Sequence, residues 1–290
     1  MRQADCVDFL KWAMPRLGFR WLGFEHCHRQ VCKRLRQRVV ELGLPGFAAY
    51  RGYALDHNTE WEMIDSCCRV TVSRLYRDKD VFDRLTVEVL PQLAANARVR
   101  GEKKLRAWSA GCAAGEEPFS LVLAWRFGAA RRFPGMALEI AATDIDDGQL
   151  ARARDGCYRP SSLRELPPTW AKKAFIASGP LRCLRPEFRQ GVTFHRQDIR
   201  ADAPKGPFDL ILCRNIAFTY FDAGQQSAVL AVILRELAPG GALVIGRRED
   251  LPDVAGAFTE WAPELRIFQK AAKTQFSSAR PLGGAAAGAR

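Results

Sequence analysis

The sequence has no apolar run that approaches the length needed to cross a lipid bilayer, which takes about 20 consecutive residues. Its start, MRQADCVDFLKWAMPRLGF, also lacks the apolar core and the small-residue cleavage site of a secretory signal. From these two absences we expect a cytoplasmic protein. Of the 290 residues, 48% are hydrophobic and 26% are charged, so we expect a substantial core in one large domain or two small ones.

Cysteine pairs of the C-x-x-C type are also missing. Nine cysteines are scattered along the chain, and we expect reduced thiols in the core, because a chain of this length does not need disulfides to fold. The segment HCHRQVC, residues 26–32, holds two His and two Cys, but its spacing is not that of a zinc site and it lies in a basic helical pattern. We therefore predict no metal site.

Acidic residues are too few to balance the basic ones. The chain has 44 Lys and Arg against 32 Asp and Glu, a formal net charge of +12. Such a field attracts acidic partners of any kind, whether nucleic acid, phospholipid or an acidic protein surface, and does not choose among them.

Strand signals are absent from the first 90 residues, where apolar residues recur at helical spacing. Helices are expected over residues 9–19, 26–44, 45–55, 59–71 and 80–98. Thr59 is placed to cap the fourth helix, and Pro91 is expected to kink or split the last. Residues 1–90 are therefore predicted to form an N-terminal helical domain with its linker helix.

From residue 105 strand and helix patterns alternate. Strands are expected over residues 105–110, 137–146, 191–199, 208–215, 242–247 and 264–271, the last closing the sheet, and helices over 116–133, 147–158 and 223–241. Alternation of this kind predicts parallel βαβ units, an α/β Rossmann-like sheet over residues 91–272. Residues 159–191 show no clean period and are interpreted as a small insertion, and 273–290 as a disordered tail.

The turn after the first expected strand, SAGCAAGEEP, has neither the third glycine of the dinucleotide fingerprint nor the ending of a P-loop. Gly111 and Gly115 let the backbone approach a ligand, while Glu116 at the helix start would repel a pyrophosphate and attract a cation. S-adenosylmethionine is a cationic ligand without phosphate, so we predict it as the cofactor, with Glu116 at its ammonium group. The neighbouring Glu117 is interpreted as serving the helix start.

Three further strand ends are expected at the same edge of the sheet. Asp144 is placed to accept hydrogen bonds from ribose hydroxyls, and Asp198 to bond an adenine amine with Ile199 beside the ring. Arg214 and Asn215 follow the fourth strand. Each residue alone is also explained as a helix cap, a turn or a favourable charge at a helix N-terminus. Their order within one βαβ series favours a binding site.

The segments RAWSAGCAAGEEPFSL, ATDIDDGQLARARDGCY and FDLILCRNIAFTYFD resemble the core motifs of CheR-type methyltransferases, which use S-adenosylmethionine to methylate glutamate side chains of chemotaxis receptors. The likeness extends upstream through LRQRVVELGLPGFAAY, RVTVSRLYRDKDVFDRL and VLPQL, and covers roughly residues 5–270. It implies a Rossmann-like methyltransferase sheet behind an all-helical domain, and O-methylation of a protein glutamate.

Carried over by position, the resemblance implies that Thr71, Ser73 and Arg77 lie against the methionine end of the cofactor. It also implies that Arg214 and Asn215 line the same crevice.

On the acceptor side, the resemblance implies that Arg34 helps to dock an acidic substrate and that Tyr220, Asn215 and Arg77 orient the acceptor. A glutamate has a reference pKa of about 4.3 and is ionised at neutral pH, so no general base is required. The partner we expect is an acidic protein or a small-molecule methyl acceptor, with no nucleic acid, and the chain is expected to be a monomer.

The sequence departs from the family pattern on the acceptor side. The family's TNETYFFR is TVSRLYR here, Tyr220 lies five rather than four residues after Asn215, and a His-Ser-Glu near the last strands is Arg247 to Glu249. Two alternatives therefore stay open: a methyltransferase with a small molecule or another side chain as acceptor, and a cofactor-binding regulatory module without catalysis.

Overall fold

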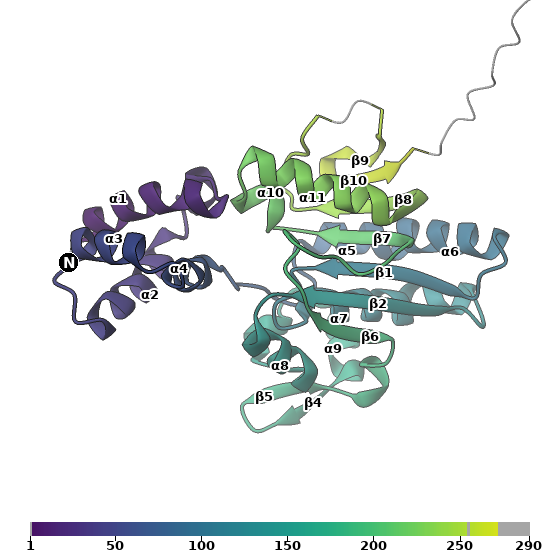
Figure 1. The fold of residues 1–290 in the computed structure, drawn as a ribbon. Coiled ribbons are helices and arrows are strands. Elements are labelled where there is room, and N and C mark those ends of the chain that lie inside the picture. Colours follow the sequence, from purple (N-terminus) through teal and green to yellow (C-terminus); the bar gives the residue numbers. More distant parts are fainter. Residues whose placement is uncertain (1, 254–255, 272–290) are drawn as a thin grey trace, which may run out of the picture.

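The computed structural model describes residues 2–253 and 256–271, and the tail expected over 273–290 lies outside the described residues. Four helices come first: α1 (Gln3–Ala13), α2 (His28–Glu41), α3 (Phe47–Asp56) and α4 (Glu60–Cys68). They gather beyond one end of the sheet (Figure 1). Thr59 occupies the position before α4, but its side chain makes no capping hydrogen bond, so the predicted cap is wrong.

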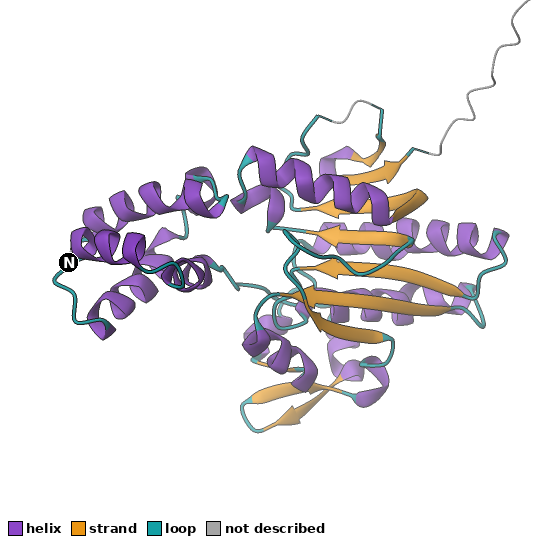
Figure 2. Cartoon of the chain, in the orientation of Figure 1, coloured by secondary structure: helices purple, strands orange, loops and turns teal. Residues whose placement is uncertain are grey.

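The stretch around Pro91 is one continuous helical run that contains a π-helical turn, so the alternative of a split into two separate helices is wrong. It comprises α5 (Lys79–Arg84), a π-helical turn (Leu85–Val89) and α6 (Leu90–Val99). Pro91 is the second residue of α6 and directly follows the π-helical turn, in which the N–H of Leu90 donates to the carbonyl of Leu85. In Figure 2 this helical run lies against the sheet rather than with α1–α4.

A sheet of seven strands carries the rest of the chain, in the order β6-β2-β1-β7-β8-β10-β9. The five parallel strands are β1 (Lys104–Ala110), β2 (Ala137–Asp144), β6 (Val192–Arg196), β7 (Phe208–Cys213) and β8 (Leu237–Ile245). β10 (Ile267–Lys270) runs antiparallel to β8, and β9 (Phe258–Ala262) pairs antiparallel with β10 at the edge. The expectation that the last strand closes the sheet is therefore wrong, because β9 lies outside it.

Helices cover both faces of this sheet, as the apolar strands require. The helices that follow its strands are α7 (Glu116–Ala124), α8 (Asp147–Asp155), α10 (Ala217–Tyr220) and α11 (Ala223–Glu236). On one face Trp108 and Ile211 belong to a core shared with α11 and the N-terminal helices. On the other face Ala107 and Leu210 belong to a core shared with α5, α6 and α7.

Residues 159–191 contain α9 (Pro168–Ala174), β4 (Phe175–Ser178) and β5 (Leu181–Leu184). The two strands pair with β3 (Cys157–Tyr158) in a separate antiparallel sheet of order β3-β5-β4. Figure 1 shows this small sheet below the main one, beside α8.

Two disulfides correct the expectation that all cysteines are reduced. Cys6 of α1 is bonded to Cys32 of α2, and Cys157 is bonded to Cys183, its direct partner in the β3–β5 pair. Packing brings together residues that lie 26 positions apart in each case. Cys27, Cys67, Cys68, Cys112 and Cys213 are free.

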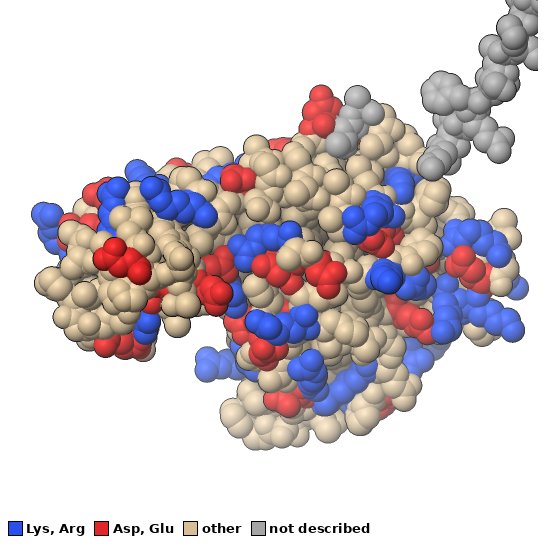
Figure 3. Space-filling model, in the orientation of Figure 1, with Lys and Arg blue, Asp and Glu red and all other residues tan. Residues whose placement is uncertain are grey.

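Within the described part of the chain, no helix is both long and apolar enough to cross a membrane. Basic and acidic side chains are interspersed where the N-terminal helices meet the sheet (Figure 3).

Candidate functional site

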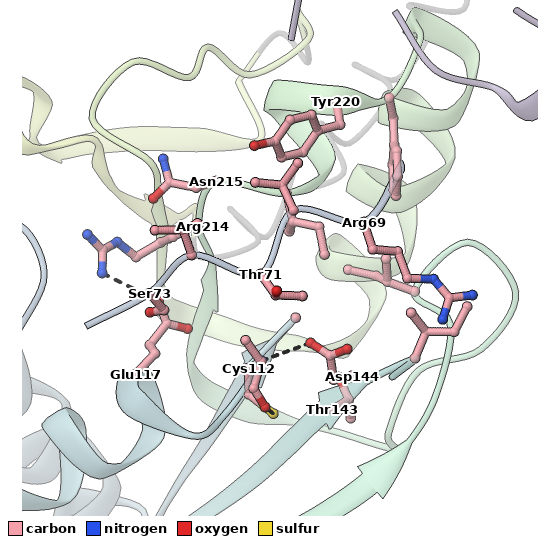
Figure 4. Close-up of a pocket in the computed structure, with 18 of the residues that line it drawn as sticks. Arg69, Thr71, Ser73, Cys112, Glu117, Thr143, Asp144, Arg214, Asn215 and Tyr220 are labelled. Atoms are coloured by element: carbon pink, nitrogen blue, oxygen red, sulfur yellow. Dashed lines mark hydrogen bonds and ion pairs between the residues drawn. The ribbon is translucent and has the colours of Figure 1, made fainter. Parts of the chain in front are cut away.

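One pocket brings together the carboxyl ends of β1, β2, β6 and β7, and residues 68–77 after α4 cross it from the N-terminal side (Figure 4). In-register pairing places Ala110 of β1 beside Thr143 of β2, so the turn after β1 and Asp144 meet at one edge. Ten of the predicted residues line it: Thr71, Ser73, Arg77, Gly111, Asp144, Asp198, Ile199, Arg214, Asn215 and Tyr220. Glu116 and Arg34 are not part of this lining.

The turn after β1 is shaped by backbone that favours glycine. Gly111 has a φ of 69° and Gly115 a φ of 85°, both in the left-handed region. A Cβ on Gly111 would lie 2.5 Å from the Cδ1 atom of Ile216, the mobile end of that side chain, so the positive φ is the main reason for glycine at this position. Ala113 also has a positive φ, 46°, and turns its N–H toward Asp144.

The two adjacent glutamates divide in the opposite way to the prediction. Glu117 lines the pocket, where Oε1 accepts a hydrogen bond from Ser109 Oγ at 2.7 Å and Oε2 lies 3.4 Å from Nη1 of Arg214. Glu116 is 5% exposed, and its Oε2 has no hydrogen-bond partner among the described residues. Consecutive helical residues point about 100° apart, so only one of the pair faces the pocket. We therefore replace Glu116 by Glu117 in the candidate site.

Burial raises the pKa of both glutamates. For Glu117 the nearby Arg214 and the hydrogen bond from Ser109 act against this rise, whereas Glu116 has only its own backbone N–H and the more distant Arg152. Of the two glutamates, Glu117 is therefore the one whose surroundings favour the ionised form more strongly.

Asp144 is held rigidly at the end of β2. Its Oδ2 accepts a hydrogen bond from the N–H of Ala113 at 2.8 Å, and Oδ1 accepts one from the N–H of Asp146 at 2.9 Å (Figure 4 shows its place beside the turn). Burial raises the pKa of Asp144, and the two N–H groups oppose that rise. An ionised carboxylate has about four acceptor positions, so each oxygen keeps capacity for a further donor such as a hydroxyl.

Arg214 is a buried cation at the end of β7. Its side chain is 2% exposed, and Nη2 donates to Asp78 Oδ2 at 2.6 Å and to the carbonyl of Arg77 at 3.1 Å. Figure 4 shows Arg214 and Glu117 on the same side of the pocket. Arg214 therefore links the segment before α5 to the start of α7.

Asn215 follows in the left-handed region, with a φ of 58°. Its N–H donates to Oε2 of Glu249 at 2.9 Å, and Oε1 of Glu249 accepts the hydroxyl of Thr219 at 2.6 Å. Glu249 is 1% exposed and also accepts from the N–H of Gly246. Sequence reasoning noted the Arg-Arg-Glu stretch only as a departure and missed that its glutamate supports Asn215.

Tyr220 lies on the N-terminal side of the pocket. Its ring centroid is 4.8 Å from that of Phe24, and its carbonyl accepts the N–H of Arg20 at 2.9 Å. Burial, followed by the nearby Cys27, raises the pKa of its hydroxyl well above the usual value. Arg77 holds the neighbouring segment, with Nη1 donating to the carbonyl of Val72 at 3.1 Å.

Arg34 does not line the pocket and instead contacts the backbone at the end of α4. Its Nη1 donates to the carbonyl of Cys67 at 3.1 Å and to that of Arg69. It therefore fixes the chain as it leaves α4, and a direct contact with a substrate stays a prediction.

Several lining residues carry no motif that sequence reasoning uses. They are Phe19, Phe24, Asp65, Arg69, Cys112, Arg200 and Phe221. Phe19 and Phe24 lie between α1 and α2, and Phe221 directly follows α10. Only the packing of these two regions shows that they share a site.

The chain is similar to known proteins over most of its length. The family described as CheR methyltransferase, SAM binding domain, matches residues 71–264. The chain is 34% identical over 186 residues to a chemotaxis protein methyltransferase of Listeria innocua, covering 64% of this chain and 68% of that protein. It is 32% identical over 245 residues to the chemotaxis protein methyltransferase of Escherichia coli, covering 81% of each. An uncharacterized 104.1 kDa protein of Rhodobacter capsulatus is 31% identical over 241 residues, of which this chain spans 25%.

Proposed function

The chain belongs to the CheR methyltransferase family and is a methyltransferase that uses S-adenosylmethionine; on that premise we propose that it methylates the side-chain carboxylate of a protein glutamate. The observation that carries the proposal is the pair of half-buried carboxylates, Glu117 and Asp144, which line the pocket on either side of a glycine turn with no phosphate-binding motif.

The residues present fit the cofactor. The carboxylate of Glu117 suits an ammonium group, and the oxygens of Asp144 suit the two hydroxyls of a ribose. Gly111 has no side chain, so only backbone faces a ligand at this point of the turn. We assign Glu117 to the methionine end, Asp144 to the ribose, and Asp198 with Ile199 to the adenine. When bound, S-adenosylmethionine supplies a methyl group activated by its sulfonium.

The chain's own contribution is to position the acceptor and exclude water. A glutamate acceptor is already ionised at neutral pH, so no residue has to remove a proton. Arg77 supplies a guanidinium for the acceptor carboxylate, and Asn215 and Tyr220 flank it across the pocket. Among the described residues lining the pocket the cations are all arginines, a side chain suited to bidentate binding of carboxylates.

A different acceptor is the second candidate, and Val72 favours it. Val72 is 64% exposed at the pocket and stands where the family pattern has an acid. An exposed apolar side chain beside the acceptor position fits an apolar substrate group as well as a peptide. The net charge of +12 supports an acidic protein as the partner in either case.

The test is transfer of a labelled methyl group from S-adenosylmethionine into proteins of a cell lysate, followed by mild alkali. A glutamyl ester releases its label as methanol, whereas N-methyl groups are stable. We expect alkali-labile label on protein. Label that survives alkali would show that the acceptor is not a carboxylate, and label found only in small molecules would show that it is not a protein. Cofactor binding without any methyl transfer would favour a regulatory module.

A further inference from the structure

Arg200, two residues after Asp198, forms an ionic bridge at the end of the pocket assigned to adenine. Its backbone N–H and Nε donate to Asp198 Oδ1 at 2.9 and 3.0 Å, and Nη2 donates to Oδ2 at 2.7 Å. Its Nη1 donates to Oδ1 of Asp65 in α4 at 2.6 Å. One guanidinium therefore joins the loop after β6 to the N-terminal helices.

The planar group of Arg200 is also enclosed by aromatic rings. Its Cζ lies 5.6 Å from the ring centroid of Phe19 and 5.7 Å from that of Phe221. These two phenylalanines form an isolated antiparallel bridge between the N-terminal segment and the residue after α10. The side chain of Arg200 is 19% exposed, so its orientation is set by both parts of the chain.

The charges in this cluster balance. Arg69 donates to Oδ2 of Asp65 at 3.3 Å, so two arginines face the two carboxylates of Asp65 and Asp198. Although burial of Asp198 opposes ionisation, the hydrogen bonds from Arg200 lower the pKa of its carboxyl. Asp198 is thus an anion whose position is fixed by donors from Arg200, and Asp198 and Arg200 both line the pocket.

We propose that Arg200 is a positioning residue that aims Asp198 at the 6-amino group of adenine, and that its bond to Asp65 makes this recognition depend on the N-terminal helices. The proposal rests on the assignment of Asp198 to adenine above. A lysine cannot replace the arginine here, because an ammonium lacks the rigid fork that spans two carboxylates.

The test measures adenine discrimination by calorimetry. The ligands are S-adenosylhomocysteine and its analogue with hydrogen in place of the 6-amino group, and the proteins are the native chain, Arg200→Lys, Asp65→Asn and Arg196→Lys. Arg196 serves as matched control because it forms an exposed pair with Asp147. We expect the native protein to bind the parent ligand about tenfold more tightly than the analogue, the value of one hydrogen bond to a charged group. Arg200→Lys and Asp65→Asn should bring the two affinities close together, and Arg196→Lys should leave their ratio unchanged.

The ratio of the two affinities distinguishes a positioning role of Arg200 from a purely structural one. Loss of a residue that only supports the fold would weaken the binding of both ligands equally. A native ratio that survives in Arg200→Lys would overturn the proposal. Equal affinities in the native protein would remove Asp198 from the adenine site and the role of Arg200 with it. Failure of the native protein to bind either ligand would instead contradict the cofactor assignment.

Discussion

The guanidinium of Arg214 and the carboxylate of Glu117 form a buried ion pair, with 3.4 Å between Nη1 and Oε2 and side-chain exposures of 2% and 14%. Asp78 contacts the same guanidinium at 2.6 Å, so two carboxylates share one cation. Arg77 lines the same pocket and also acts on Glu117, so the charges of these side chains balance. The carboxylate of Glu117 keeps acceptor capacity beyond these contacts, which suits the ammonium of S-adenosylmethionine.

Replacing Glu117 by Gln should weaken cofactor binding by about tenfold or more, because a hydrogen bond to a charged group is lost while the shape is kept. Glu116→Gln is the matched control, as the same change one residue earlier lies outside the pocket. We expect its affinity to stay within about threefold of the native value. Titration calorimetry with S-adenosylmethionine measures the cofactor affinity of both variants. A larger loss of affinity in Glu116→Gln than in Glu117→Gln would show that Glu116 is the glutamate that binds the cofactor.

Cofactor affinity should fall on acidification from a higher pH than an ordinary glutamate would give. Burial raises the pKa of Glu117 and of Asp144, so these carboxylates protonate before a solvent-exposed acid does as the pH falls. Protonated Glu117 loses its attraction for the ammonium, and protonated Asp144 has fewer acceptor positions for the ribose hydroxyls, so affinity is full above the raised pKa values and declines below them. In Glu117→Gln the affinity for S-adenosylmethionine should depend less on pH than in the native protein. An unchanged pH profile in that variant would show that Glu117 does not control the dependence.

The buried pair of Arg38 and Glu60 should contribute to stability in an acid-sensitive way. Glu60 is 3% exposed and accepts hydrogen bonds from Arg38 and from Tyr50, and the Arg38 bond lowers its pKa. Because the folded pKa lies below the unfolded one, the stabilisation is complete above the unfolded pKa of about 4.3 and is lost as the pH falls through the folded value.

Glu60→Gln should therefore lower the free energy of unfolding at neutral pH by about 2–4 kcal/mol, since it leaves Arg38 without its buried partner. Glu41→Gln removes a weaker contact to the same arginine, 3.8 Å long and half exposed, and should cost under about 0.5 kcal/mol. Denaturant unfolding of both variants at neutral and acid pH measures the difference. Equal losses in the two variants would contradict a special role for Glu60.

The central strands β1 and β7 were predictable because their burial leaves a direct trace in the sequence. β6 has no buried residue, and residues 237–241 of β8 lie in a stretch that the sequence predicted as a helix. All six residues of β7 are buried, and FDLILC is apolar except for Asp209, whose carboxylate pairs with Arg100. β9 left no such trace, since only Ala262 of its five residues is buried. The two disulfides were equally hidden, because each joins positions 26 residues apart that only tertiary packing brings together.

The candidate site was predictable as a set of strand ends and less so in its details. Asp144 and Asn215 follow strands whose ends the sheet must bring together. The choice between Glu116 and Glu117 depends on the rotation of α7, and an error of one residue turns a side chain by about 100°. The roles of Arg200 and Glu249 depend on partners far away in sequence, Asp65 and Asn215, so local patterns could not predict them.

Docking of the N-terminal segment on α10 should control methyl transfer more than cofactor binding. Gly23 lies against Thr219, and a Cβ at Gly23 would overlap the carbonyl oxygen of Thr219. Arg20 secures the same contact through its Nε, which donates to that carbonyl at 3.0 Å. Tyr220 is the next residue, so an added methyl group at position 23 displaces the side chain that faces the acceptor.

For Gly23→Ala we expect the rate of alkali-labile methyl incorporation to fall by about tenfold or more, because small displacements of an orienting group are costly in rate. Affinity for S-adenosylmethionine should change by less than about threefold, since Glu117 and Asp144 lie on α7 and β2 and not on α10. Gly52→Ala is the control: it lies in the exposed part of α3 with no atom near its added Cβ and should stabilise that helix by about 0.5–1 kcal/mol. Equal losses of rate and of affinity in Gly23→Ala would mean that this contact holds the whole pocket and not its acceptor side alone.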